Sequence, residues 1–175
     1  MTAGPDPGCD DGPMAEPVPY LSGLRLAGRR VAVVGAGRVA ERRLERLLDA
    51  AAAIEVIAPQ ATVRISRLAE AGRLTWVRRS YRPGDLDGAW YVLAATDDQD
   101  CNEQVSNEAE RQRIFCVRSD DRAEATAWTP ASGEVDGVQI GVLAGGDHRR
   151  SRRIRDAVLK ALIKIIGSER GHRAA

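Results

Sequence analysis

Two pairs of aspartates lie shortly after apolar runs of this sequence. Asp97 and Asp98 follow one run, and Asp120 and Asp121 follow another. A carboxylate in such a position can accept a proton, hold a ribose hydroxyl or cap the next helix. We expect a helix from Gln99, which makes Asp98 its cap. No helix is expected after Asp120, so a catalytic and a structural role are equally open for this residue.

A glycine-rich stretch nearer the amino terminus indicates what these carboxylates could act beside. Residues 31–34 predict a buried strand, and the sequence GAGRVA follows it. In this G-x-G-x-x-A pattern Gly35 permits a tight turn, Gly37 lets a pyrophosphate approach the backbone, and Ala40 lets the next helix pack closely. The turn therefore predicts a dinucleotide site at a helix amino terminus. The alternative is a tight turn that binds nothing.

The acidic residue that usually completes such a site is missing. In dinucleotide-binding folds an Asp or Glu about twenty residues further on holds the ribose hydroxyls. Here the second strand, residues 54–58, ends in Ala58, and Glu55 lies in mid-strand, turned away from the strand's apolar face. We therefore expect ribose recognition from groups near Pro59 and Gln60. The usual rule that separates NAD from NADP does not apply.

Strands and helices alternate over the first two thirds of the chain. Helices are expected at residues 60–71 and 99–113, and further strands at 74–77, 90–95 and 114–117. This alternation predicts an α/β fold with a Rossmann-like parallel sheet, whose ligands lie at the carboxyl ends of the strands. By that rule, the residues that follow these strands lie around one crevice, residues 118–120 among them. The candidate cofactor contacts there are Gly35, Ala36, Gly37, Arg38, Val39, Pro59, Gln60, Thr96 and Asp97.

The pattern changes after Asp120. Residues 123–129 and 138–143 read as two strands joined by the turn ASGEVDG, which predicts an appended antiparallel pair suited to a dimer contact. An amphipathic helix is expected from near Arg152. The expected organisation is a disordered tail at residues 1–19, an NAD-binding Rossmann-like domain at 20–120, dimerisation strands at 121–146, and a short, truncated basic helical segment at 147–175.

Arginines cluster at the start of that last segment, namely Arg149, Arg150, Arg152 and Arg153. They could form a solvated helix face, a nucleic-acid-binding tail or an electrostatic guide for a small polyanionic substrate. Composition alone favours the solvated face.

Composition narrows the function classes. Lys and Arg number 26 against 25 Asp and Glu, and aromatic residues make up 4%, so nothing indicates a nucleic-acid partner. Three cysteines without a CxxC pair fit a reducing cytoplasm and form no recognisable metal site. We interpret His148 and His172 as surface residues. No apolar run approaches the ~18 residues of a membrane span.

These pieces together resemble the precorrin-2 dehydrogenase family, the amino-terminal module of siroheme synthases. The resemblance rests on VAERR after the glycine turn, VIAP at the end of the second strand, ATDD followed by NEQVS, Asp120, and GVLAGGD before the basic helix. It implies NAD-dependent oxidation of precorrin-2 to sirohydrochlorin by a homodimer, with Asp120 as the catalytic residue. It also implies NAD contacts at Arg38, Val39, Pro59 and Gln60.

The same resemblance leaves some questions open. A tetrapyrrole with many carboxylates is a polyanion. The two interpretations of the arginine cluster, attraction of the substrate and a solvated helix face, are therefore equally open. Bifunctional members of the family also insert ferrous iron, so Fe²⁺ is a candidate second substrate. Arg118 and Ala144 depart from residues common in the family. The alternatives are a protein that is chiefly a sirohydrochlorin ferrochelatase and a non-catalytic NAD-sensing module.

Overall fold

The computed structural model describes the backbone of residues 18–173 and the side chains of residues 18–168. The predicted disordered tail, residues 1–19, lies almost wholly outside the described residues. His172 lies outside the described side chains.

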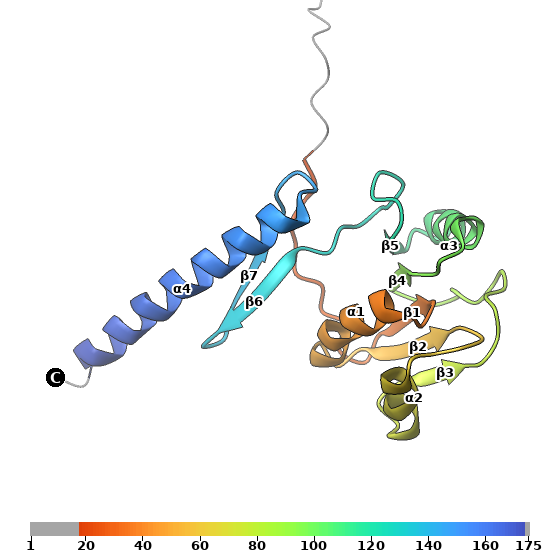
Figure 1. Ribbon diagram of the computed structural model, residues 1–175, viewed down its shortest axis with the longest axis horizontal. Helices are drawn as coiled ribbons and strands as arrows, with labels where there is room; N and C mark the ends of the chain where they lie inside the picture. The colour runs from red at the N-terminus through yellow and green to blue at the C-terminus, as the bar shows by residue number, and fades with distance from the viewer. Residues whose placement is uncertain (1–17, 174–175) are drawn as a thin grey trace, which may run out of the picture.

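A five-stranded parallel sheet lies toward one end of the molecule (Figure 1). Its strands are β1 (Arg30–Val34), β2 (Ala53–Ile57), β3 (Thr75–Val77), β4 (Tyr91–Ala94) and β5 (Phe115–Arg118), in the order β3-β2-β1-β4-β5. The crossover helices are α1 (Arg38–Asp49), α2 (Val63–Glu70) and α3 (Gln99–Arg111). The predicted Rossmann-like fold is therefore confirmed, and the strand order reverses beside β1, where such sheets bind ligands.

Each face of the sheet is covered by apolar side chains from different helices. On one face, Leu44 of α1 and Ile65 of α2 pack with Val33 and Val56 of the sheet. On the other face, Val105 of α3 packs with sheet residues such as Val34 and Val92. These side chains are fully or almost fully buried. We call this unit, β1–β5 with α1–α3, the body.

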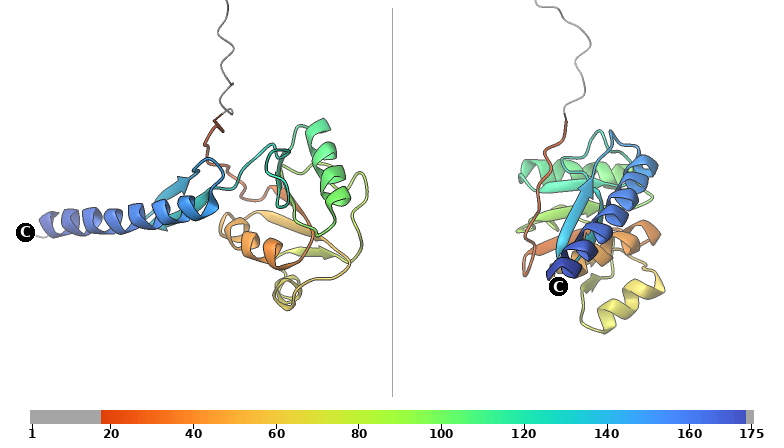
Figure 2. Two further views of the ribbon diagram at one scale, coloured as in Figure 1. Left: turned by 45° about the horizontal axis from the view of Figure 1, so that its top comes forward. Right: turned by 90° about the vertical axis from the view of Figure 1, so that its left-hand side faces the viewer.

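A second unit, which we call the arm, follows the body. It consists of the hairpin β6 (Ala131–Val135) and β7 (Val138–Val142) and the long helix α4 (His148–Arg173). Figure 2 shows the hairpin and α4 extending away from the sheet. Helix α4 packs on the hairpin, and it does so closely, because a Cβ atom on Gly133 would lie 2.4 Å from Cδ1 of Leu159.

The predicted antiparallel pair exists, but its first strand was misplaced. Residues 123–129 form no strand, and β6 lies at Ala131–Val135 instead. The two-residue turn is Asp136-Gly137, with φ values of 53° and 77°. Positive φ at both positions gives the turn that best suits the twist of paired strands. Most of the stretch predicted as a turn, ASGEV, is therefore strand.

Two helix starts also differ from the prediction, because capping residues determine them. Helix α2 begins at Val63 rather than at residue 60, since the Thr62 hydroxyl accepts a hydrogen bond from the N–H of Ile65 (3.3 Å). Helix α4 begins at His148 rather than near Arg152, and a carboxylate oxygen of Asp147 accepts hydrogen bonds from its first turn.

Candidate functional site

The glycine turn between β1 and α1 lies at the carboxyl edge of the sheet and is held on both sides. The N–H of Gly35 donates to the carbonyl of Ile57 (2.9 Å), and the N–H of Thr62 donates to the carbonyl of Ala36 (3.1 Å). Gly35 has φ +101°, and a Cβ atom there would lie 2.3 Å from the carbonyl oxygen of Ala95. The packing of the turn itself therefore requires glycine at position 35.

At Gly37, the second glycine of the turn, no neighbouring protein atom excludes a larger side chain. A Cβ atom at this position would meet nothing within 4 Å, and Gly37 caps α1 without a side-chain hydrogen bond. The N–H groups in the first turn of a helix have no partner inside the helix, and they attract anions. The open space beside them therefore fits the pyrophosphate of a dinucleotide.

A buried hydroxyl follows β5, at the same edge of the sheet. Ser119 follows β5, and its N–H donates to the carbonyl of Ala94 at the end of β4 (3.0 Å). Its side-chain oxygen is buried and has no hydrogen-bond partner among the described residues. Because a buried hydroxyl without a partner costs free energy, a polar group of a ligand would be stabilised there.

Thr96 and Asp97 lie in a turn that a buried amide holds in place. Asn102 is fully buried, accepts from the N–H of Thr96 (3.1 Å) and donates to the Thr96 carbonyl (3.0 Å). Asp98 accepts from the N–H of Cys101 (3.1 Å), which confirms its predicted role as the helix cap. The asparagine after the ATDD sequence thus fixes the shape of the turn after β4.

Asp120 lies beyond β5 and is paired with an arginine that sequence reasoning did not assign to it. Arg118 donates to both carboxylate oxygens, at 2.8 and 3.3 Å. Their side chains are only 7% and 17% exposed, respectively. This hydrogen bonding outweighs burial and holds the pKa of Asp120 below its usual range. The carboxylate is therefore ionised at neutral pH and has a fixed orientation.

A pocket beside Asp120 is lined by both the body and the arm. Arg43, Arg118 and Arg122 make it electropositive, and His148 and Ser151 contribute from α4. His148 is exposed, as predicted, although it also borders this pocket. The pocket thus combines one carboxylate with three guanidinium groups, which suits an anionic substrate.

Two of these arginines make contacts of their own, and only Arg43 comes from a distant part of the sequence. Arg43 donates to the hydroxyl of Thr129 (3.0 Å), and burial lowers the pKa of its guanidinium. Arg122 lies 4.7 Å from the ring centre of Trp128 and fills the space beside Gly146, where any Cβ atom would overlap it. Gly146 has φ +83°, a conformation that favours glycine.

The structure does not bring the four predicted substrate-binding arginines into this pocket. Arg149, Arg150, Arg152 and Arg153 are exposed on α4, and none of them lines the cavity beside Asp120. Their role toward a substrate stays a prediction, and it would act through charge at a distance rather than through contact.

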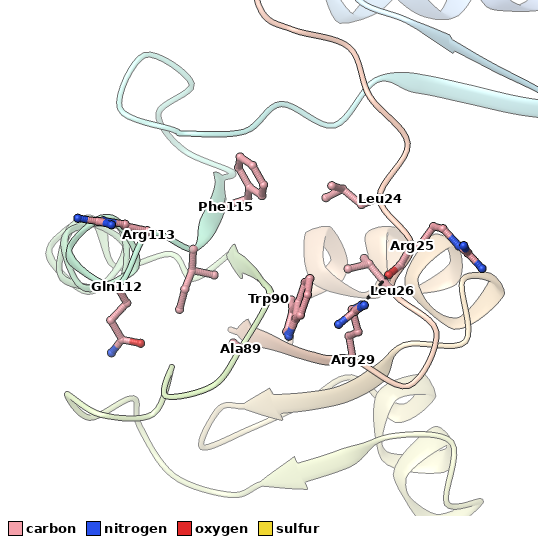
Figure 3. A pocket seen from close by; sticks show the side chains of 10 residues that line it. Leu24, Arg25, Leu26, Arg29, Ala89, Trp90, Gln112, Arg113 and Phe115 are labelled. Carbon is pink, nitrogen blue, oxygen red and sulfur yellow. Dashed lines mark hydrogen bonds between the residues drawn. The ribbon is translucent and has the colours of Figure 1, made fainter.

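A cavity of about 440 Å³ lies at the opposite, amino edge of the sheet (Figure 3). There the guanidinium of Arg29 lies 3.4 Å from the ring centre of Trp90, beside Leu24 and Phe115. Its lining contains no carboxylate, imidazole or thiol. This cavity therefore offers no group for acid–base or nucleophilic chemistry.

Other reactive groups in the described residues are few. Cys101 and Cys116 are free thiols, and burial raises the pKa of both, that of Cys116 to about 11, so neither is a thiolate at neutral pH. The described part of the chain contains no group of three or more His, Cys, Asp or Glu that could hold a metal ion. None of its helices is both long and apolar enough to cross a bilayer.

The predicted cofactor contacts lie together at the carboxyl edge of the sheet. The turn after β1 carries Gly35 to Gly37, and α1 begins with Arg38 and Val39. The turns after β2 and β4 carry Pro59 with Gln60 and Thr96 with Asp97, and Asp120 follows β5. Individual binding roles stay predictions.

Comparison with known proteins gives relatives for this arrangement. Siroheme synthase 1 of Aeromonas hydrophila is 35% identical over 144 residues, which are 82% of this chain and 31% of that protein. The siroheme synthase of Photorhabdus laumondii is 33% identical over 140 residues, 80% of this chain and 30% of that protein. This chain therefore spans about a third of the length of these relatives.

A solved structure and a family model extend the comparison. The structure titled SirC, precorrin-2 dehydrogenase, superimposes with a TM-score of 0.72 at 26% identity, covering 81% of this chain and 70% of that one. A family model described as putative NAD(P)-binding matches residues 23–131, which include the glycine turn, the turn at Thr96 and Asp120. Since the match covers more than half of the sequence, the chain belongs to this putative NAD(P)-binding family.

Proposed function

We propose that this chain is an NAD-dependent dehydrogenase that oxidises precorrin-2 to sirohydrochlorin in siroheme biosynthesis. The observation that carries the proposal is the ionised carboxylate of Asp120, which Arg118 holds at the same sheet edge as the glycine turn. The names of the relatives, siroheme synthase and precorrin-2 dehydrogenase, support the choice of substrate.

The residues around the edge match the needs of this reaction, in which precorrin-2 loses a hydride and a proton. When bound, NAD supplies the hydride acceptor. Loss of the hydride leaves a cationic tetrapyrrole, which the Asp120 carboxylate stabilises and from which it accepts the proton. Arg43 and Arg122 attract the carboxylates of the substrate. The turns at Gly37 and Thr96 orient the dinucleotide.

The test is anaerobic incubation of the purified protein with precorrin-2 and NAD, followed by absorbance. We expect sirohydrochlorin and NADH to form in equal amounts. Binding of NAD without turnover would contradict the proposal and indicate an NAD-sensing module. Conversion of sirohydrochlorin and Fe²⁺ to siroheme, without any NADH formation, would contradict it in favour of a ferrochelatase.

The Asp120→Asn variant tests the assigned residue, because asparagine keeps the size of the side chain and removes its charge and basicity. We expect kcat to fall at least about a hundredfold, since general-base contributions are worth roughly 10²–10⁴-fold. NAD affinity should change little.

Asp121→Asn is the matched control for that variant. The Asp121 carboxylate accepts from the N–H of Ala123 (2.9 Å) and does not line the pocket. Its kcat should stay close to that of the wild type. Wild-type turnover by Asp120→Asn would show that another group, such as Asp97, accepts the proton.

We further propose that the protein works as a cytoplasmic homodimer in which residues 20–120 bind the cofactor, and in which the dimerisation strands of residues 121–146, together with the described part of α4, join the two copies. Three apolar side chains of α4 support this arrangement, since Val158, Ile163 and Ile165 are 41%, 56% and 54% exposed. Sedimentation equilibrium should give twice the chain mass. A monomer at micromolar concentration would contradict the proposed dimer. It would not contradict the proposed reaction, which the NADH assay tests separately.

A further inference from the structure

We propose that the cavity at the amino edge of the sheet is a second tetrapyrrole site, which binds the product sirohydrochlorin without acting on it. The inference rests on the proposed function, because that reaction supplies the ligand. The cavity of about 440 Å³ has the size of a small-molecule site, ~300–1,000 Å³. Its residue Trp90 directly precedes β4, whereas Asp120 follows β5 at the carboxyl edge. The cavity is therefore separate from the pocket in which we place the reaction.

Apolar side chains form the centre of this cavity. Trp90 precedes β4, and Phe115 begins the neighbouring strand β5, so the two rings lie at the amino ends of adjacent strands. Trp90, Phe115 and Leu24 are 54%, 52% and 43% exposed. Single exposed apolar residues are common on protein surfaces, but a group of large ones in one concave lining indicates a binding surface.

Guanidinium groups surround that centre. In Figure 3, Arg25 and Arg113 lie at opposite ends of the cavity, and their guanidinium groups point outward. Neither they nor Arg29 has an ion-pair partner in the described part of the chain. The lining contains no carboxylate that could neutralise them. Unpaired positive charge of this kind favours an anionic ligand.

The third arginine of the lining, Arg29, is already held in place. Its guanidinium lies 3.4 Å from the centre of the Trp90 ring, and its Nε donates to the carbonyl of Arg25 (3.1 Å). An anion that binds to its terminal N–H groups therefore meets a side chain that is already ordered. Binding then costs little further rotamer entropy.

A flat ring with carboxylates around its rim matches this arrangement. A tetrapyrrole has this form, because its macrocycle is largely apolar and its acid side chains project outward. The face of the macrocycle would cover Trp90 and Phe115, and the carboxylates would pair with the arginines at both ends of the cavity. A nucleotide matches less well, because its negative charge lies at one end of the molecule.

The oxidised product fits the cavity better than the substrate does. When precorrin-2 loses a hydride and a proton, the ring gains a double bond. The added double bond extends the conjugation and flattens the macrocycle. A flatter ring makes closer contact with the exposed rings of Trp90 and Phe115. We therefore assign the cavity to sirohydrochlorin rather than to precorrin-2.

Anaerobic equilibrium dialysis with sirohydrochlorin as the probe tests the inference. The double variant Arg25→Glu with Arg113→Glu should weaken the binding of one sirohydrochlorin per chain at least about tenfold, the effect of losing charge-assisted hydrogen bonds. Its kcat and KM for precorrin-2 should stay near wild-type values. Arg73→Glu with Arg78→Glu is the matched control, because these exposed arginines give the same change in charge and do not line the cavity.

A second variant and a second probe test the apolar centre. Phe115→Ser removes one half-exposed ring and keeps the arginines, so it should weaken the same binding about fivefold. Citrate carries carboxylates without a ring, and it should bind at least about tenfold more weakly than sirohydrochlorin. Thermal unfolding checks that each variant is folded, and the arginine variant decides if Phe115→Ser is not.

The outcomes separate this inference from the proposed function. Equal sirohydrochlorin binding by the wild type and both variants would refute the second site and leave the dehydrogenase intact. Citrate binding as tight as that of sirohydrochlorin would also refute it, because the arginines would then hold any polyanion. A fall in kcat in the arginine variant would contradict a site that is separate from the reaction. Binding at the cavity without NADH formation in the turnover assay would support the site and refute the dehydrogenase alone.

Discussion

The body buries a large apolar core, whereas no apolar side chain in the described part of the arm is buried, and Val158, Ile163 and Ile165 of α4 are exposed. Backbone hydrogen bonds tie neighbouring turns of the body together at the carboxyl edge of the sheet, such as those from Gly35 to Ile57 and from Ser119 to Ala94. The hydrogen bonds that join arm and body are more exposed, for example the one from Arg46 to the carbonyl of Ser132 (3.4 Å).

This difference assigns separate tasks to the two regions. The glycine turn and the turn at Thr96, where we propose that the cofactor binds, belong entirely to the body. The pocket at Asp120 is bordered by both regions. Changes at the glycine turn should therefore affect folding or cofactor affinity, while changes around the Asp120 pocket or in the arm should affect the reaction of the substrate.

Gly35→Ala should have the largest effect, because it attacks the body itself. The new Cβ atom would lie 2.3 Å from the Ala95 carbonyl oxygen, at a φ of +101° that side chains rarely adopt. We expect a loss of about 3 kcal/mol or more in the free energy of unfolding. That is a large part of the ~5–15 kcal/mol of a typical domain. Urea denaturation measures it, and an unchanged midpoint would contradict the close approach of the turn to β4.

Gly37→Val separates cofactor binding from folding. Its Cβ atom meets no protein atom, so the thermal unfolding midpoint should stay near that of the wild type. The valine side chain fills the space that the pyrophosphate needs, and NAD binding should be abolished in calorimetry. Unchanged NAD affinity in the folded variant would show that the cofactor lies elsewhere.

The body could be predicted from the sequence, because local patterns determine it. Alternating strands and helices gave the parallel sheet, and the position of Asp98 before α3 gave its cap. The arm was harder, since β6 contains Ser132, Gly133 and Glu134 rather than β-branched residues, and the Asp-Gly turn signal was read as part of a longer loop.

Of the three arginines around Asp120, the sequence could have indicated one but not the other two. Arg118 lies two residues before Asp120, and alternation in an extended segment puts both side chains on one side, so this pair was within reach. Arg43 lies far away in the sequence, and Arg122 reaches the pocket through a turn. Only the folded chain brings them together.

Arg118→Gln tests the junction between the two regions through its pH dependence. Arg118 lowers the pKa of Asp120, so the ionised, active form persists to a pH below the usual aspartate range. Without the guanidinium the pKa rises, and the acidic limb of kcat should move up by about one pH unit or more. Arg118→Lys should restore much of the original profile. A general fall in kcat without a shifted limb would indicate that Arg118 is only structural.

Charge reversal of the arginine cluster in the arm should have the smallest effect. Arg149, Arg150, Arg152 and Arg153 do not line the Asp120 pocket, so changing all four to Glu should leave kcat and NAD affinity near wild-type values. Exposed charges still attract a polyanion over about a Debye length, ~10 Å at 0.1 M salt. We therefore expect the KM for precorrin-2 to rise about tenfold at low salt and to lose much of its salt dependence.

Reversal of four exposed arginines on the body, Arg25, Arg73, Arg78 and Arg113, makes the same change in net charge and is the control. If both variants raise KM equally, total charge rather than the arm guides the substrate. If neither does, the cluster is a solvated helix face. A rise in KM for precorrin-2 in the arm variant alone would assign substrate capture to α4. The cofactor would then depend on the body, and capture of the substrate on the arm.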